Sequence, residues 1–165
     1  MSAFLRPLAI AAAVAMLWTG AASRAAATSH LPVSAVVRGA VITQAFGCSS
    51  LVLEPFDPYC PTRHFHSGVD LAAPEGTTVY AATAGHAVAG YDEKGAGLFV
   101  SVTVDPHVRV LYCHLHRAAL AAGDVSTGDV IGEVGSSGLA TGAHLHLEID
   151  VDGRAVDPER WLAAS

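Results

Sequence analysis

Two short runs of residues contain the side chains whose types and spacing could do chemistry. Residues 66–70 read His-Ser-Gly-Val-Asp, and residues 144–146 read His-Leu-His. A histidine and an aspartate four positions apart, followed downstream by a His-x-His, offer nitrogen and oxygen ligands for Zn²⁺ with one histidine to spare. Catalytic zinc typically has three protein ligands and keeps a fourth position open for water. These runs therefore predict hydrolytic chemistry at a metal.

Strands must position these side chains. Successive side chains of a β-strand alternate between its faces, so His144 and His146 are expected to point the same way. By the same alternation, His66 and Asp70 share one side of a short strand predicted over residues 66–72. The segment 144–151 continues the pattern, with polar residues at even positions and apolar residues at odd positions.

Most of the remaining chain alternates strand and turn signals. Segments rich in Val, Thr, Tyr and Phe are separated by Gly, Asp and Pro. Strands are predicted over residues 40–45, 66–72, 77–82, 86–91, 98–104, 108–115 and 144–151. Asp152-Gly153 is typical of a hairpin turn, and residues 157–162 indicate a capped helical turn with proline at its first position. We expect a compact antiparallel all-β domain without a second module.

The beginning of the chain has the layout of a secretory signal peptide. Arg6 precedes a nearly uncharged apolar run over residues 8–20, and Ala25-Ala26-Ala27 resembles a cleavage site. An uncleaved membrane anchor is the alternative, although this run is shorter than the ~20 apolar residues that span a bilayer. We expect a signal peptide at 1–27, a lead at 28–40 and a functional domain at 41–162. The protein would be exported, to the periplasm or cell wall, without stable membrane insertion after cleavage.

Charge argues against nucleic acid as a partner. Without residues 1–27 the chain keeps seven basic residues against fifteen acidic ones, and Lys94 is its only lysine. No basic patch is present to bind a phosphate backbone.

Three cysteines are present, and export would permit a disulfide. Cys48 and Cys60 flank a proline-containing loop that leads to His66, and a bridge would fix that loop. A zinc-binding cysteine pair is the competing interpretation, but no second pair completes four ligands. Cys113 is expected to be a small buried residue that alternation turns away from the face of His114.

Five segments in order resemble the lysostaphin-type (LytM-like) zinc metallopeptidases, which cut peptidoglycan peptides. The matching segments are residues 66–74, 76–82, 112–115, 128–138 and 141–148. The resemblance covers about residues 41–162. It implies the all-β fold of that family, the duplicated hybrid motif kind, with a short C-terminal helical turn.

The resemblance also implies residue roles. His66, Asp70 and His146 would bind one zinc ion per chain, and His114 and His144 would be catalytic. All five positions are filled, which argues against the zinc-less regulators that share the fold. Departures are minor: Ser136-Ser137-Gly138 replaces a more usual Ser-Thr-Gly, and Cys113 occupies a position where alanine is common.

Several roles stay open at this level. Glu148 shares the strand face of His144 and His146, and is either a partner that orients an imidazole or a solvated carboxylate. His64 is a rival ligand, two positions before His66. His86, His107 and His116 are expected to be ordinary surface or loop residues.

Three functions compete. The first is an exported zinc endopeptidase that acts as a monomer on peptidoglycan peptides. The second is a non-enzymatic module of the same fold that binds peptidoglycan or activates a wall amidase. The third is a metallocarboxypeptidase that releases terminal D-alanine, which the three-residue gap between His66 and Asp70 disfavours.

Overall fold

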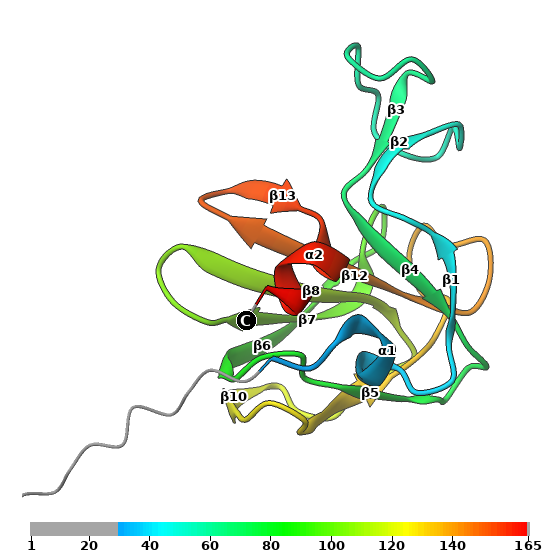
Figure 1. The fold of residues 1–165 in the computed structure, drawn as a ribbon. Helices are drawn as coiled ribbons and strands as arrows, with labels where there is room; N and C mark the ends of the chain where they lie inside the picture. Colours follow the sequence, from blue (N-terminus) through cyan, green and yellow to red (C-terminus); the bar gives the residue numbers. More distant parts are fainter. Residues whose placement is uncertain (1–29, 165) are drawn as a thin grey trace, which may run out of the picture.

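Antiparallel strands dominate the structure, a computed structural model that describes residues 30–164 (Figure 1). The predicted all-β class is confirmed. The expected signal peptide lies outside the described residues. Within the described part of the chain, no helix has the length and apolar character needed to cross a membrane.

Thirteen strands and two short helices are present in the described residues. The strands are β1 (Val41–Gln44), β2 (Gly47–Ser49), β3 (His64–His66), β4 (Gly68–Ala72), β5 (Thr78–Tyr80), β6 (Gly85–Asp92), β7 (Gly97–Thr103), β8 (Val108–Leu115), β9 (Arg117–Ala118), β10 (Ala122–Val125), β11 (Val130–Glu133), β12 (His144–Val151) and β13 (Arg154–Val156). The helices are α1 (Val33–Val36) and α2 (Pro158–Ala163). Asp157 caps α2 by accepting hydrogen bonds from the first turn, with Pro158 at the first position as predicted.

The largest sheet has the strand order β1-β4-β12-β8-β7-β6-β10, and β13 pairs with the end of β12. A three-stranded sheet has the order β5-β11-β9, and β2 pairs with β3 in a separate hairpin. One face of the large sheet carries the core, which includes Leu71, Tyr112 and Leu147, all at most 2% exposed. The opposite face of β4, β12 and β8 is free to carry polar side chains.

The strand predicted over residues 66–72 is two strands in different sheets. β3 ends at His66 and pairs with β2, whereas β4 begins at Gly68 and pairs with β1 and β12. The chain changes partners at Ser67, so the single-strand prediction was wrong. His66 and Asp70 therefore reach the same place from two elements rather than from one face of one strand. The helix α1 was also not expected, because its four residues are too few to show a helical period.

A disulfide joins Cys48 on β2 to Cys60 in the loop between β2 and β3, with the two Cα atoms 5.4 Å apart. The predicted pairing is therefore present. Figure 1 shows this hairpin and its loops projecting away from the large sheet. The bridge closes a long loop and restricts the segment that leads to His66.

Thiol counting on protein produced in an oxidising compartment should find one free cysteine, which reacts only after denaturation. Cys113 is 4% exposed, and burial raises the pKa of its thiol to about 12. Because the thiolate is the reactive form, labelling of the native protein should be slow. Two or three free thiols in protein from an oxidising compartment would contradict the pairing.

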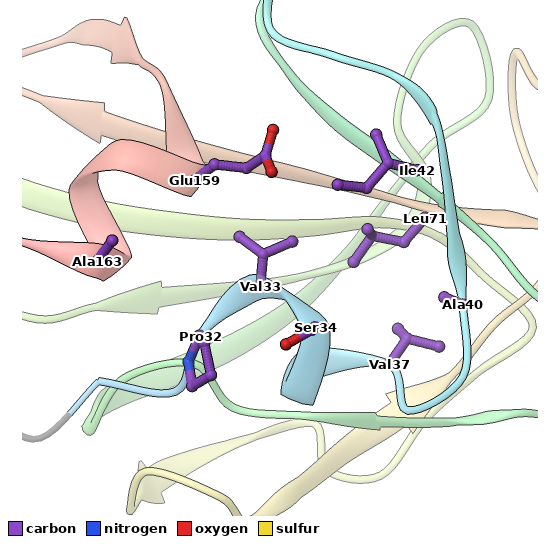
Figure 2. A pocket seen from close by; sticks show the side chains of 9 residues that line it. All are labelled: Pro32, Val33, Ser34, Val37, Ala40, Ile42, Leu71, Glu159 and Ala163. Carbon is purple, nitrogen blue, oxygen red and sulfur yellow. The ribbon is translucent and has the colours of Figure 1, made fainter.

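A pocket of about 470 Å³ lies between α1, α2 and β1 (Figure 2). Its lining is mostly apolar, and Glu159 extends from α2 toward Ile42 as its only ionisable side chain. One carboxylate without a histidine, cysteine or second acid provides neither a metal site nor a nucleophile. The candidate chemistry therefore lies on the other face of the sheet.

Candidate active site

Three adjacent strands form the floor of the site. On β12, His146 lies opposite Asp70 of β4 on one side and opposite Cys113 of β8 on the other. His144 lies two positions before His146 and lines the same cleft, as strand alternation predicts. The regular pairing of β4 with β12 thus brings the Asp70 carboxylate to the His-x-His motif.

The side chains of His66, Asp70 and His146 converge on one point. His66 Nε2 lies 3.1 Å from Asp70 Oδ1 and 3.0 Å from His146 Nδ1. His146 Nδ1 lies 3.0 Å from Asp70 Oδ1, which closes a nearly equilateral triangle. Among the described residues, this is the only group of three such ligand atoms that could hold a metal ion.

The triangle fits a tetrahedral zinc ion. Zinc bonds of 2.0–2.1 Å to nitrogen or oxygen imply ligand atoms about 3.3 Å apart. The observed edges of 3.0–3.1 Å are close to that value. Two imidazoles and one carboxylate also match the ligand types of catalytic zinc. The residues present therefore fit the metal.

Outer contacts orient both imidazoles of the triangle. His66 Nδ1 donates to the Ala45 carbonyl oxygen at 3.0 Å, which leaves the Nε2 lone pair for a metal. His146 Nε2 faces Glu148 Oε2 at 3.6 Å, and the Ser67 hydroxyl donates to the same carboxylate oxygen. Glu148 is thus placed where it can orient the His146 imidazole.

Gly68 is required by the close approach of β12. A Cβ at this position would collide with the carbonyl oxygen of Leu147 and lie 2.9 Å from the His146 ring. The glycine inside the His-Ser-Gly-Val-Asp run thus allows the His146 ring to lie against β4. Its role is steric, because the backbone there is extended.

The charges around the triangle favour a bound cation, either a proton or a metal ion. Burial acts to raise the pKa of Asp70, but hydrogen bonds from His146 and His66 outweigh it and hold this pKa well below the usual carboxyl range. Burial acts to lower the pKa of His146, but Asp70 and Glu148 raise it to about 9. A cluster rich in negative charge attracts a cation, and a metal ion would have to displace the His146 proton.

Two further imidazoles flank the triangle. The ring centroids of His114 and His144 lie 4.8 Å apart, and His144 Nε2 lies 3.8 Å from Asp70 Oδ1. Each Nδ1 donates to a backbone carbonyl: His114 to Ser137 at 2.9 Å and His144 to Gly142 at 2.8 Å. Because a carbonyl only accepts, each neutral ring keeps its lone pair on Nε2. Burial lowers the pKa of His114, which favours this neutral form.

His114 has an unusual backbone conformation that changes which side chains reach the cleft. Its φ is +63°, in the left-handed region that non-glycine residues seldom adopt. The backbone N–H of His114 donates to the Ala96 carbonyl oxygen at 2.8 Å, which holds this geometry. Alternation is broken here, so Cys113 and His114 both line the cleft. The prediction that Cys113 faces away from His114 was wrong, although Cys113 is buried as expected.

The cleft around these residues has a volume of about 710 Å³. One wall consists of the disulfide loop, with Leu51, Leu53 and Glu54. The other wall consists of the β6–β7 turn and the β11–β12 loop. Such an open groove can admit an extended peptide across the metal-binding triangle.

The other histidines lie outside the triangle. His64 Nδ1 bonds the Glu54 carbonyl oxygen at 2.8 Å and its ring contacts Phe56, so His64 is not part of the ligand cluster. His86, His107 and His116 are exposed and each lies beside a carboxylate. The expected surface positions are therefore confirmed. Sequence patterns could not identify the orienting carbonyls of Ala45, Ser137 and Gly142, because backbone acceptors leave no signal in residue type.

Curated relatives resemble this chain over the same region. A DD-carboxypeptidase/endopeptidase, Mpg, of Neisseria meningitidis is 41% identical over 101 residues, which are 61% of this chain and 24% of the relative. The peptidoglycan DD-endopeptidase ShyA of Vibrio cholerae is 38% identical over 93 residues, 56% of this chain and 22% of the relative. The chain thus spans about a quarter of the length of these relatives.

A solved structure and a family model agree with these relatives. The catalytic domain of the antimicrobial peptidase lysostaphin from Staphylococcus simulans superposes with a TM-score of 0.65 at 27% identity, covering 81% of this chain and 98% of that domain. The model of peptidase family M23 matches residues 64–158, which include the five histidine and aspartate positions of the site. The predicted lysostaphin-type resemblance is confirmed, and the chain belongs to peptidase family M23.

Proposed function

We propose that this chain is an exported zinc metalloendopeptidase that hydrolyses peptide bonds in peptidoglycan cross-bridges or stem peptides. One observation carries the proposal: a triangle of His66, Asp70 and His146 ligand atoms lies beside two further imidazoles in an open cleft. Family membership and the endopeptidase names of its relatives support the reaction class.

Each side chain has a distinct proposed role. His66, Asp70 and His146 hold one zinc ion, which would supply a Lewis acid and lower the pKa of water. His114 and His144 present Nε2 lone pairs toward the cleft, so one can accept the proton of the attacking water. When protonated, the same imidazoles can stabilise the developing oxyanion and protonate the released amine. Glu148 and Ala45 orient the two imidazole ligands.

The proposal includes the organisation of the chain. Residues 1–27 act as a signal peptide, residues 28–40 as a lead, and residues 41–162 as the peptidase domain. The exported protein acts as a monomer in the periplasm or cell wall, with peptidoglycan peptides as partners and no nucleic acid. The excess of acidic over basic residues supports the absence of a nucleic-acid partner.

Digestion of purified, cross-linked muropeptide dimers tests the function. Mass spectrometry should show dimers converted to monomers, with loss of activity after chelation and recovery after addition of zinc. Uncleaved dimers in the presence of zinc would instead favour the non-enzymatic module of the same fold.

A second activity is favoured by a specific relative. The Neisseria protein is named for both carboxypeptidase and endopeptidase activity. The same digests therefore include monomers that end in D-alanyl-D-alanine. Release of free D-alanine from them would add the carboxypeptidase reaction to the function.

A further inference from the structure

We infer that Lys94 is a specificity residue that binds a carboxylate of the substrate. This carboxylate belongs to the substrate residue whose amine is released when the peptide bond is cut. The inference rests on the proposed peptidase function and deepens it. It concerns which peptide bond the cleft accepts, rather than how the bond is broken.

The turn that carries Lys94, an exposed residue, is held against the strand that carries His114. Lys94 lies in the turn between β6 and β7 and lines the cleft. Its neighbour Gly95 accepts a hydrogen bond from the Leu139 N–H at 2.9 Å, and Ala96 accepts one from the His114 N–H at 2.8 Å. The turn is therefore bonded to the β11–β12 loop and to the strand that carries His114.

The charge of Lys94 has no partner within the described structure. Its backbone N–H donates to Asp92 Oδ1 at 3.1 Å, but its ammonium group forms no ion pair with any described residue. Among the residues that line the cleft, Lys94 is the only lysine or arginine. An acidic chain thus places its one lysine, unpaired, at the wall of its candidate active site.

The opposite wall has the opposite charge. Glu54 lines the cleft from the disulfide loop and accepts a hydrogen bond from Gln44 Nε2 at 2.8 Å. A substrate carboxylate would be repelled from Glu54 and attracted to Lys94, which orients the peptide across the groove.

The position of Lys94 indicates which residue of the substrate it contacts. His114 is a proposed proton donor to the released amine, and its backbone is bonded to the turn of Lys94 through Ala96. The residue that contributes this amine therefore lies on the Lys94 side of the cleft. A carboxylate on that residue would be within the reach of a lysine side chain.

Two peptidoglycan bonds have this chemistry. In a cross-link to a diaminodicarboxylic acid, the carbon that bears the released amine also bears a carboxylate. A terminal D-alanine has the same arrangement. An interior glycine bridge has no free carboxylate there. Lys94 thus favours the first two bonds over a glycine bridge.

The test compares substrates that differ only in this carboxylate. The full chain, loaded with zinc, is given a cross-linked dimer with the carboxylate free and the same dimer with it amidated. A second pair has a D-alanyl-D-alanine terminus, free or amidated, which distinguishes a cross-link from a chain end. Wild-type protein should prefer the free carboxylate in at least one pair, and Lys94→Gln should reduce that preference about 3- to 10-fold through KM.

Matched variants keep the test specific. Arg154→Gln removes one positive charge from an exposed position on β13, outside the cleft, and should preserve the preference. Lys94→Arg should retain most of it, and high salt should weaken it in the wild type. If Lys94→Gln slows free and amidated substrates equally, or if the wild type prefers the free carboxylate in neither pair, Lys94 does not select a carboxylate. If wild-type protein cuts no substrate at all, the proposed peptidase function itself fails.

Discussion

Replacing His114 or His144 with alanine is expected to leave zinc bound but to reduce peptidoglycan cleavage by about 10²–10⁴-fold, the usual cost of losing a general base or oxyanion donor. Both imidazoles flank the ligand triangle without completing it, and each directs a free Nε2 toward the cleft. No glutamate on a His-Glu-x-x-His helix is present in the sequence to replace them.

Two controls separate chemistry from folding. The left-handed backbone of His114 disfavours alanine, whereas asparagine tolerates that conformation, so His114→Asn tests the loss of the imidazole with less strain. His86→Ala removes an exposed histidine that pairs with Asp124 and should leave cleavage unchanged. Turnover close to wild type in both the His114 and His144 variants, with zinc bound, would contradict the proposed mechanism.

Removal of any of the three ligands is expected to abolish zinc binding and activity together. His66→Ala, Asp70→Ala and His146→Ala each remove one corner of the triangle of ligand atoms. Metal analysis after dialysis should find zinc in the wild type and none in these variants. His64→Ala is the matched control, because its ring bonds the Glu54 carbonyl and lies outside the cluster.

Replacing Glu148 is expected to weaken zinc binding without abolishing it. Glu148→Gln keeps the side-chain shape but removes the charge that faces His146 Nε2. Losing such an outer partner typically lowers metal affinity about 10–100-fold, less than losing a ligand.

The ligand variants and their control also define the result that would contradict the assigned ligands. Loss of zinc in His64→Ala but not in Asp70→Ala would show that the ligand set is wrong.

Regular strand pairing explains why much of the site was predictable. β12 is an uninterrupted strand, so alternation placed His144 and His146 on one face, with Leu145 and Leu147 in the core. The disulfide was also predictable, because Cys48 and Cys60 flank a loop without a strand pattern of its own. In both cases the local residue pattern and the tertiary structure agree.

The failures occur where the backbone departs from a regular strand. The positive φ of His114 turns its side chain toward the same cleft as Cys113. The alternation rule assumes extended backbone at every position, so it cannot predict this. The change of sheet at Ser67 separates His66 from Asp70, although both still reach the triangle. Each departure depends on hydrogen bonds to distant residues, such as Ala96 for His114, that a local pattern does not contain.

The most direct test of the account is a titration of metal-free protein with zinc, with cleavage of cross-linked muropeptides measured at each step by mass spectrometry. The rate should rise from none to a plateau at one zinc ion per chain, and His146→Ala should stay inactive throughout. Full cleavage by the metal-free protein, or a plateau reached equally by His146→Ala, would contradict a peptidase centred on His66, Asp70 and His146.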